Sequence, residues 1–327
     1  DRDSKEIERM KNDSIYLLGD SFLNTMYFIY LGPFTSAYRA EILKEIQKEC
    51  KSNGISISPN YSFVSSILDE ETIDKWIQYG LNDESTSIEN AIMIIFSPLS
   101  SYIIDPYSFA SKWLKNFDYT DSQLMVLKPN TSNLLRSMET YVRTGVTVLL
   151  EDISDKIDPA LDSIIARKTF SQDGKRYVKL NDRNIELDEK FRLFLTTKMH
   201  NPQLLPNFYT KATVIMYIPT KEMLEKTELN ALFTLEYPEL NKEKDDLQAK
   251  LIENKRTVIQ NETRILELMR TNEEIIIDDD ILIDTVVTNK KNNDILMEEI
   301  EKIKTQINTI LLKREKLLPV TNRIGLL

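Results

Sequence analysis

Cysteine and histidine are nearly absent from this chain, and their scarcity excludes several kinds of chemistry. The only cysteine is Cys50, so no disulfide can form within the chain, which fits a reducing compartment. Cys50 is also a poor candidate nucleophile, because the only histidine, His200, is distant in sequence. A single histidine cannot build a multi-histidine metal centre, so we expect an inert thiol and no metal site.

Long apolar runs and a basic surface are also missing. No apolar run approaches the roughly 18 residues that a membrane-spanning helix needs, and no signal-peptide pattern occurs near the start. The formal net charge is −10, and Lys and Arg alternate with Asp and Glu. Binding to nucleic acid needs a concentrated basic face, so we expect neither nucleic acid nor a membrane as partner. The chain begins with Asp1, and we expect it to be part of a longer protein.

The 327 residues are 41% hydrophobic and 29% charged, an ordinary globular composition for one large or two smaller domains. Apolar residues recur at helical spacing through residues 15–30, and Gly32 with the following proline then interrupts the pattern. Two further helices are predicted over residues 36–50 and 69–79, the second ending at Gly80. The first 90 residues are therefore expected to be helical.

Short apolar runs alternate with helical segments between residues 90 and 220. Continuously apolar runs are typical of strands that are buried on both faces of a parallel sheet, so an α/β domain is predicted. The expected strands are residues 91–96, 102–104, 123–127, 146–150, 191–196 and 213–218. Residues 175–180 and 184–187 flank Asn181-Asp182 and predict an inserted β-hairpin.

From about residue 221 the chain is charged and lacks glycine until Gly325. Apolar residues and asparagines recur there at steps of three and four, which predicts an antiparallel coiled-coil hairpin over residues 239–318. Each arm of about 40 residues would reach roughly 60 Å. The alternative is two surface helices packed on the domain, but the apolar stripe is narrow. The expected seam is Leu247, Leu251, Asn254, Val258, Asn261, Ile265, Val286, Asn289, Asn293, Leu296, Ile300, Ile303, Ile307 and Ile310.

Asparagines in this seam lead to a specific hypothesis. With a turn near residues 274–277, Asn261 lies opposite the second arm's asparagines, and we expect it to pair with Asn289 or Asn293. Such a pair can fix the register of two helices at a cost in stability. The alternative is that an asparagine-rich chain merely tolerates these residues.

The α/β region contains the outline of a P-loop without its chemistry. A working loop reads G-x-x-x-x-G-K-[ST], because glycines let backbone N–H groups surround the phosphates and the lysine reaches the β- and γ-oxygens. Here Asp105 and Ala110 replace the glycines, while Ser111 and Lys112 stand where Lys and Ser/Thr belong. We therefore expect no ATP hydrolysis, no catalytic residue and no cofactor, with weak or structural nucleotide binding as the alternative. The loop residues of this degenerate pocket are Asp105, Pro106, Ser108, Ala110, Ser111 and Lys112.

A carboxylate pair, Glu151-Asp152, follows the predicted strand 146–150. A Walker B strand ends in Asp-Glu, where Asp orients Mg²⁺ and Glu activates water, and here the order is reversed. The pair is either the relic of such a site or an acidic helix start.

Several blocks of the chain resemble the dynein heavy chain family around its fifth AAA+ module. GDSFL at 19–23 and YLGPFTSAYR ending at Arg39 are similar to the segment that joins the stalk to this module. The blocks that follow in the family's order are SIENAIMII, YIIDPYSFASKWLKN, VLLEDISDKIDPALDSII, FRLFLTTKMHNPQLLPNF and KLLPVTNRIG. The resemblance extends over most of the chain.

The resemblance implies a three-layer AAA+ domain that lacks a working nucleotide site, in a ring of six modules where other modules bind ATP. It also implies that the hairpin is the buttress that props the microtubule-binding stalk. Partners would be the neighbouring modules and the stalk, and indirectly microtubules and dynein subunits, in the cytoplasm or a cilium. The implied segments are the returning stalk helix (1–18), a helical lead-in (19–90), the large domain (90–225), the buttress with small-domain helices (226–318) and the connection to the sixth module (319–327).

The resemblance gives further residues a possible role. Thr197 and Asn201 follow a strand where AAA+ proteins place a polar residue beside the γ-phosphate, although such residues also satisfy strand-end loops. Lys211 stands roughly where AAA+ proteins present a cation to the adjacent module's nucleotide, and the alternative is an ordinary surface lysine. Many relatives have glycine or a small polar residue where Ser108 and Phe109 stand. Two other functions remain open: an autonomous P-loop ATPase and a coiled-coil scaffold.

Overall fold

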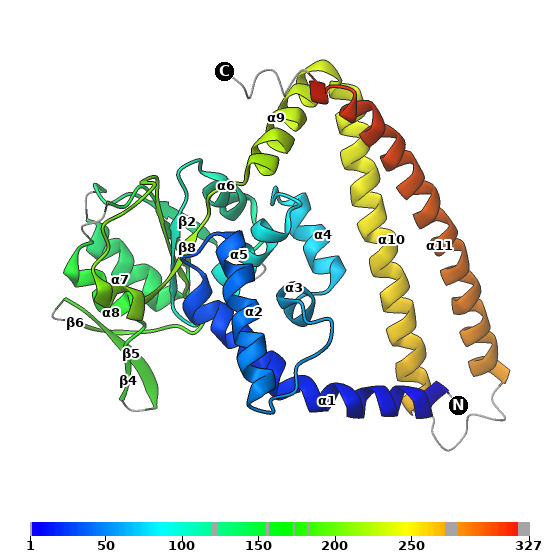
Figure 1. Cartoon of the computed structure of the whole chain (residues 1–327), viewed down its shortest axis with the longest axis horizontal. Helices are drawn as coiled ribbons and strands as arrows, with labels where there is room; N and C mark the ends of the chain where they lie inside the picture. Colours follow the sequence, from blue (N-terminus) through cyan, green and yellow to red (C-terminus); the bar gives the residue numbers. More distant parts are fainter. Residues whose placement is uncertain are drawn as a thin grey trace. The chain divides into compact units, whose positions relative to one another are not determined.

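The structure is a computed structural model that describes residues 2–119, 123–131, 133–154, 157–172, 174–181, 183–271 and 280–319 (Figure 1). At residues 2–13, 265–271 and 280–286 the description covers the backbone alone. The chain divides into two compact units, and each is described separately below. The first comprises Asp1–Asp69 and Tyr79–Ile218, and the second comprises Glu70–Gln78 and Pro219–Leu327. None of the helices described has the length and apolarity that crossing a membrane requires.

The first unit is built on a five-stranded parallel sheet with the order β2-β3-β7-β1-β8. Its register places Ile104, at the end of β1, between Thr197 and Met216. The predicted α/β class with a parallel sheet is confirmed, and five of the six expected strands are present. The strands are β1 (Ser100–Ile104), β2 (Leu124–Leu127), β3 (Thr147–Leu150), β7 (Leu193–Thr197) and β8 (Ala212–Met216).

Helices cover both faces of this sheet, which explains its continuously apolar strands. Every residue of β1, β3 and β7 is buried. Tyr102 and Leu195 lie on one face, in a core that also contains Met138 of α7 (Leu134–Thr144) and Ile165 of α8 (Asp162–Ile165). On the other face, the Ser101 hydroxyl donates a hydrogen bond of 3.0 Å to the carbonyl of Ile94 in α5 (Ser85–Phe96), the helix that precedes β1. The three-layer arrangement follows from these contacts.

The expected strand 91–96 is wrong, because these residues form the end of helix α5 (Ser85–Phe96). The helix is buried on nearly all sides, with Ile88, Ala91, Ile92 and Met93 at most 8% exposed. A helix without a polar face has no helical periodicity in sequence, so a short apolar run from it cannot be told from a buried strand.

Of the remaining helices of the first unit, those before residue 90 agree with the helical pattern predicted there. A π-helical turn continues α1 directly and ends at Gly32, where the sequence predicted a break. The short α3 was not predicted. The elements are α1 (Arg2–Met26), the π-helix η1 (Tyr27–Leu31), α2 (Ser36–Ser52), α3 (Phe63–Ile67), α6 (Phe109–Asn116) and the 3₁₀ turns η2 (Pro159–Leu161) and η3 (Pro206–Thr210).

A small antiparallel sheet, β4-β5-β6, is inserted after α8. The predicted hairpin is confirmed in β5 (Lys175–Leu180) and β6 (Arg183–Glu186), although Asp182 in its turn lies outside the described residues. The third strand, β4 (Thr169–Gln172), was missed because all its residues are exposed and give no apolar signal. Val178 and Ile185 join the main core.

The second unit contains two long helices that pack along each other, α10 (Pro238–Thr271) and α11 (Asp280–Glu315) (Figure 1). Side-chain hydrogen bonds join Asn254 to Glu299 and Asn261 to Asn293. Partners on α11 move back along the chain as those on α10 move forward, so the helices are antiparallel. The expected turn at 274–277 lies outside the described residues.

Burial along these helices follows the heptad positions. Asn254 and Val258 of α10 are buried, and so are the four isoleucines of α11 at positions 300, 303, 307 and 310. The other seam positions are half-buried: Leu247, Leu251, Asn261, Asn289, Asn293 and Leu296. The side chains of Ile265 and Val286 lie outside the described residues.

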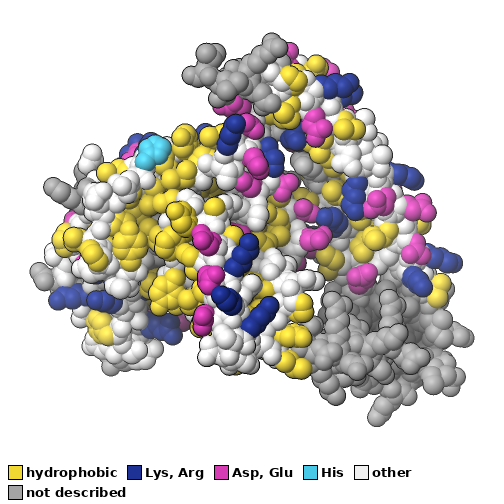
Figure 2. All heavy atoms as spheres, in the orientation of Figure 1, with side chains coloured by type: hydrophobic (Ala, Val, Ile, Leu, Met, Phe, Trp, Pro, Cys, Tyr) yellow, Lys and Arg dark blue, Asp and Glu magenta, His cyan; other side chains and the backbone are white. Residues whose placement is uncertain are grey.

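Two shorter helices complete the second unit, α4 (Glu70–Gln78) and α9 (Lys221–Glu236). α4 belongs with α10 although some 160 residues or more separate them in sequence: it packs against α10, and Lys255 forms an ion pair with Asp74. On the molecular face drawn in Figure 2, basic and acidic side chains are interspersed, as their alternation in the sequence predicts.

Candidate functional site

The degenerate loop lies where a phosphate-binding loop belongs, between the end of β1 and the start of α6. The backbone N–H of Asp105 donates a hydrogen bond of 2.8 Å to the carbonyl of Thr197 at the end of β7. On the other side, the N–H of Tyr217 donates to Ile104 at 2.9 Å. The loop therefore leaves the interior of the sheet at its carboxyl edge, the usual place for ligands in parallel α/β folds.

The carboxylate of Asp105 occupies the anion position of this loop. Its Oδ1 accepts a hydrogen bond of 2.8 Å from the backbone N–H of Phe109, and Oδ2 accepts one of 2.9 Å from the N–H of Ser111. The side chain is 1% exposed. The first N–H groups of a helix have no partner within the helix and attract anions. Here the chain's own carboxylate accepts hydrogen bonds from two of these groups.

Burial raises the pKa of Asp105 above its ordinary value, and the hydrogen bonds from Ser111 and Phe109 oppose that rise. The amino end of α6 adds a partial positive charge that also favours the ionised form. A phosphate brought to the same N–H groups would meet both the carboxylate volume and its charge. The sequence identified the position of Asp105, but not its hydrogen bonds.

The rest of the loop keeps the backbone of a glycine-type turn with larger side chains. Ser108 has a φ of 59°, in the left-handed region that costs a residue other than glycine about 1–2 kcal/mol. The rings of Tyr107 and Phe109 stack at 6.2 Å, and His200 contacts Tyr107 edge-on at 5.8 Å. Ala110 is buried, Pro106 is half-buried, and Lys112 is exposed. The aromatic rings of Tyr107, Phe109 and His200 therefore form a cluster at the loop.

Both carboxylates of the reversed Walker B pair are engaged with lysines. Glu151 forms an ion pair with Lys115 of α6, with 2.7 Å between its Oε1 and the lysine Nζ. Asp152 lies 2.9 Å from the amine of Lys198 and 3.7 Å from that of Lys128, and the hydrogen bond from Lys198 lowers its pKa. These lysines were not predicted, because each comes from a different segment and no motif links them. Glu151 and Lys115 join the end of β3 to the helix that follows the loop.

The three candidates at the end of β7 and beyond it, Thr197, Asn201 and Lys211, differ in their surroundings. Thr197 is buried, and its hydroxyl accepts a hydrogen bond of 3.3 Å from the N–H of Met199, as a strand-end residue does. Asn201 is exposed. Lys211 forms an ion pair with Asp162 of α8. The Thr197 carbonyl also accepts the N–H of Asp105, which joins this residue to the loop.

No group of three or more potential metal ligands occurs among the described residues. Cys50 is buried beside Leu23 and Ile57, in a small apolar cluster.

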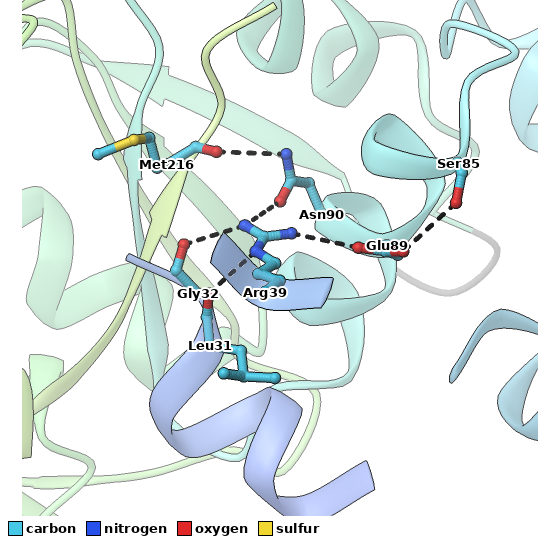
Figure 3. Close-up of polar contacts among 7 residues, drawn as sticks. All are labelled: Leu31, Gly32, Arg39, Ser85, Glu89, Asn90 and Met216. Atoms are coloured by element: carbon cyan, nitrogen blue, oxygen red, sulfur yellow. Dashed lines mark hydrogen bonds and ion pairs between the residues drawn. The ribbon is translucent and has the colours of Figure 1, made fainter. Parts of the chain in front are cut away.

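A second polar constellation, which the sequence did not predict, surrounds Arg39 (Figure 3). This side chain is 1% exposed, and Nε donates to the carbonyl of Leu31 at 2.9 Å. One terminal nitrogen donates to Gly32 at 3.0 Å and to Asn90 Oδ1 at 2.7 Å, and the other lies 3.5 Å from Glu89. Burial lowers the pKa of Arg39 and raises that of Glu89. The arginine therefore ties the turn after η1 to helix α5.

The same turn is attached to the sheet through β8. The N–H of Met216 donates to the carbonyl of Gly32 at 2.9 Å, and the Asn90 amide donates to the carbonyl of Met216 at 3.3 Å. A Cβ on Gly32 would lie 2.3 Å from the carbonyl oxygen of Val214, so only glycine fits. This explains the position of glycine in the YLGPFTSAYR block.

Helix α1 is fixed to the loop after α2. A Cβ on Gly19 would lie 2.1 Å from the carbonyl oxygen of Ser56, and Asp20 accepts the N–H of Ser58 at 3.0 Å. The Tyr61 hydroxyl donates to Asn24 at 2.8 Å. These contacts account for the glycine and aspartate of the GDSFL block.

Sheet, loop and flanking helices define an α/β domain of the AAA+ class, with a buried carboxylate in the loop that follows β1. Residues 74–296 match the family described as the ATP-binding dynein motor region. The chain belongs to this family, the AAA motor region of dynein heavy chains.

Similar proteins include dynein axonemal heavy chain 6 of Homo sapiens, 31% identical over 98% of this chain and 8% of that protein. The Dynein-1-beta heavy chain, flagellar inner arm I1 complex, of Chlamydomonas reinhardtii is 32% identical over 78% of this chain and 6% of its own length. Dynein axonemal heavy chain 3 of Homo sapiens is 31% identical over 87% and 7%. The chain thus spans less than a tenth of the length of these relatives.

Proposed function

We propose that this chain is the fifth AAA+ module of a dynein heavy chain and that it does not hydrolyse ATP. The observation that carries this proposal is the pair of hydrogen bonds that the Asp105 carboxylate accepts from Phe109 and Ser111. A nucleotide phosphate needs these N–H groups, and it would have to displace a buried carboxylate to reach them.

Two further features support a non-catalytic module. Lys112 is exposed and shifted by one position from the phosphate-binding lysine of the motif. Glu151 and Asp152 are held by lysines, so neither carboxylate is free to orient Mg²⁺ or activate water. ATP bound by other modules of the parent chain would supply the energy.

We further propose that α10 and α11 form the buttress that relays ring movement to the microtubule-binding stalk. Movement by rigid bodies needs segments that do not yield internally. In the first unit, Arg39 and Gly32 tie the turn after η1 to both α5 and β8. In the second, the ion pair of Asp74 and Lys255 attaches α4 to α10.

The named relatives are axonemal or flagellar dyneins, which supports a cilium or axoneme as the location. Partners would then be neighbouring modules and the stalk of the same chain, with microtubules and dynein subunits as indirect partners. The autonomous ATPase and the scaffold are the competing functions.

A phosphate-release assay tests the non-catalytic part. The chain with Mg-ATP is expected to release phosphate at the rate of a buffer blank, and Glu151→Gln should leave that rate unchanged. A rate above the blank that falls in Glu151→Gln, but not in the control variant Glu139→Gln at a half-buried glutamate of α7, would establish the autonomous ATPase instead.

A further inference from the structure

A cavity lies at the amino edge of the sheet, opposite the edge that carries the degenerate loop. Its volume is about 130 Å³, and its lining includes Ser100 at the start of β1, Arg192 just before β7, and Arg167 after α8. One water molecule occupies roughly 30 Å³ of liquid, so the cavity has room for a small ion. It is smaller than the roughly 300–1,000 Å³ typical of pockets for drug-sized ligands.

The two arginines bring positive charge to this cavity, and none of the described residues that line it is acidic. Within the described part of the chain, no Asp or Glu forms an ion pair with either guanidinium. Burial, and next the charge of Arg192, lower the pKa of Arg167. Arg167 is half-buried and Arg192 is exposed. Two like charges near each other repel, and an anion between them would remove that cost.

Most donors of these arginines remain for a ligand. The Arg167 side chain donates to the carbonyl of Phe191, and Arg192 donates to the carbonyl of Ile95 at the end of α5. Each guanidinium has five N–H groups in a planar fork that matches the oxygens of carboxylate and phosphate. The backbone bonds orient the two forks and use a small part of their capacity.

Ser100 provides an independent sign of a missing ligand. It is 4% exposed, and its hydroxyl has no hydrogen-bond partner among the described residues. Buried hydroxyl groups are nearly always paired, and an unpaired one requires an explanation such as an absent ion or water. The hydroxyl lines the same cavity as the two arginines.

We propose that Arg167, Arg192 and Ser100 form a binding site for a small oxyanion, namely a phosphate or carboxylate group. The two arginines supply charge-assisted hydrogen bonds, and the hydroxyl of Ser100 donates one more. This site does not depend on the nucleotide loop, which lies at the other end of β1, nor on the function proposed above.

Calorimetric titration of the whole chain with sodium phosphate, at constant ionic strength set by chloride, tests the site. We expect saturable binding to the wild type that Arg192→Gln weakens by about tenfold or more. Ser100→Ala is expected to weaken binding by a few-fold without lowering the free energy of unfolding, because its hydroxyl has no partner to lose. Arg183→Gln, an exposed arginine on β6, is the matched control and should bind as the wild type does.

A parallel titration with sodium acetate distinguishes the two sources of the anion. Tighter binding of phosphate supports a free phosphate-type ligand, and tighter binding of acetate supports an acidic side chain of another segment. Either result supports the oxyanion site when it is lost in Arg192→Gln. Absence of saturable binding of both ions, or equal affinities in Arg192→Gln and Arg183→Gln, would overturn it. Near-ultraviolet circular dichroism checks that each variant is folded.

Discussion

Asn261 of α10 donates a hydrogen bond of 2.8 Å to the side-chain oxygen of Asn293 of α11. Asn293 is one of the two partners expected from the heptad spacing. Both side chains are half-buried, so the pair joins the two arms through polar groups in a seam that is mostly apolar. An asparagine pair of this kind favours one register over its neighbours, at a cost in stability.

This pair predicts non-additive stability. Asn261→Leu or Asn293→Leu alone should gain little, because the remaining asparagine loses its partner at a cost of about 1–3 kcal/mol. The double variant should raise the free energy of unfolding by more than the sum of the singles. Urea unfolding of the four proteins gives the coupling energy. Strict additivity within about 0.5 kcal/mol would show that the hydrogen bond carries no energy.

The hairpin should depend on its buried seam. Ile303 is 5% exposed, and Ile303→Asp places a charge in that contact, which should cost about 3 kcal/mol or more. Hydrogen exchange is expected to increase along α10 and α11, while the sheet of the first unit stays protected. Ile295→Asp, at a position 59% exposed on the same helix, is the matched control. Equal loss of protection in both units would argue against a separately stabilised hairpin.

The Arg39 constellation should be a major source of stability in the first unit. Arg39→Ala removes the guanidinium that contacts Glu89 and the Asn90 side-chain oxygen. It should lower the free energy of unfolding by about 3–5 kcal/mol. Arg39→Lys should also destabilise, because a lysine cannot reach both carbonyls and Asn90 with a planar fork. Arg143→Ala, at an exposed arginine of α7, is expected to change the free energy by less than about 1 kcal/mol. A similar small change for Arg39→Ala would contradict the assigned role.

Asp105 predicts a pH dependence whose sign follows from its raised pKa. The folded state binds the proton of this group more tightly than the unfolded state does. Its contribution to stability is therefore largest below the ordinary aspartate pKa, and it decreases as the pH rises through the folded-state value. The wild type should lose stability relative to Asp105→Asn between pH 4 and pH 7. Urea unfolding of both proteins at the two pH values measures this difference, and the opposite trend would mean that the N–H bonds outweigh burial.

The fold could be predicted largely from local patterns, and the failures have physical causes. Strands such as β3 are recognisable because their residues are apolar or β-branched throughout, as burial on both faces requires. The same burial explains the wrong prediction at residues 91–96, because the buried helix α5 has no polar face that would reveal a helical period. The exposed strand β4 has no apolar pattern, so pairing with β5 alone defines it.

The candidate site was predictable only in part. Alignment with the P-loop motif was enough to locate Asp105 in the loop, because the spacing of a motif is a local property of the sequence. The lysines that hold Glu151 and Asp152 come from α6, the start of the loop after β2, and the segment after β7, which only the folded chain brings together. Arg39 belonged to a recognised block, but its burial depends on α5, some 50 residues further along.

The most direct test of the central claim is calorimetric titration with Mg-ATP of the wild type and of Asp105→Gly. The wild type is expected to bind no Mg-ATP at micromolar concentrations, because the carboxylate already holds the N–H groups of Phe109 and Ser111. Asp105→Gly exposes these groups and should bind phosphate-containing ligands more tightly than the wild type does. A micromolar Mg-ATP site in the wild type that disappears in Ser111→Glu would contradict the account.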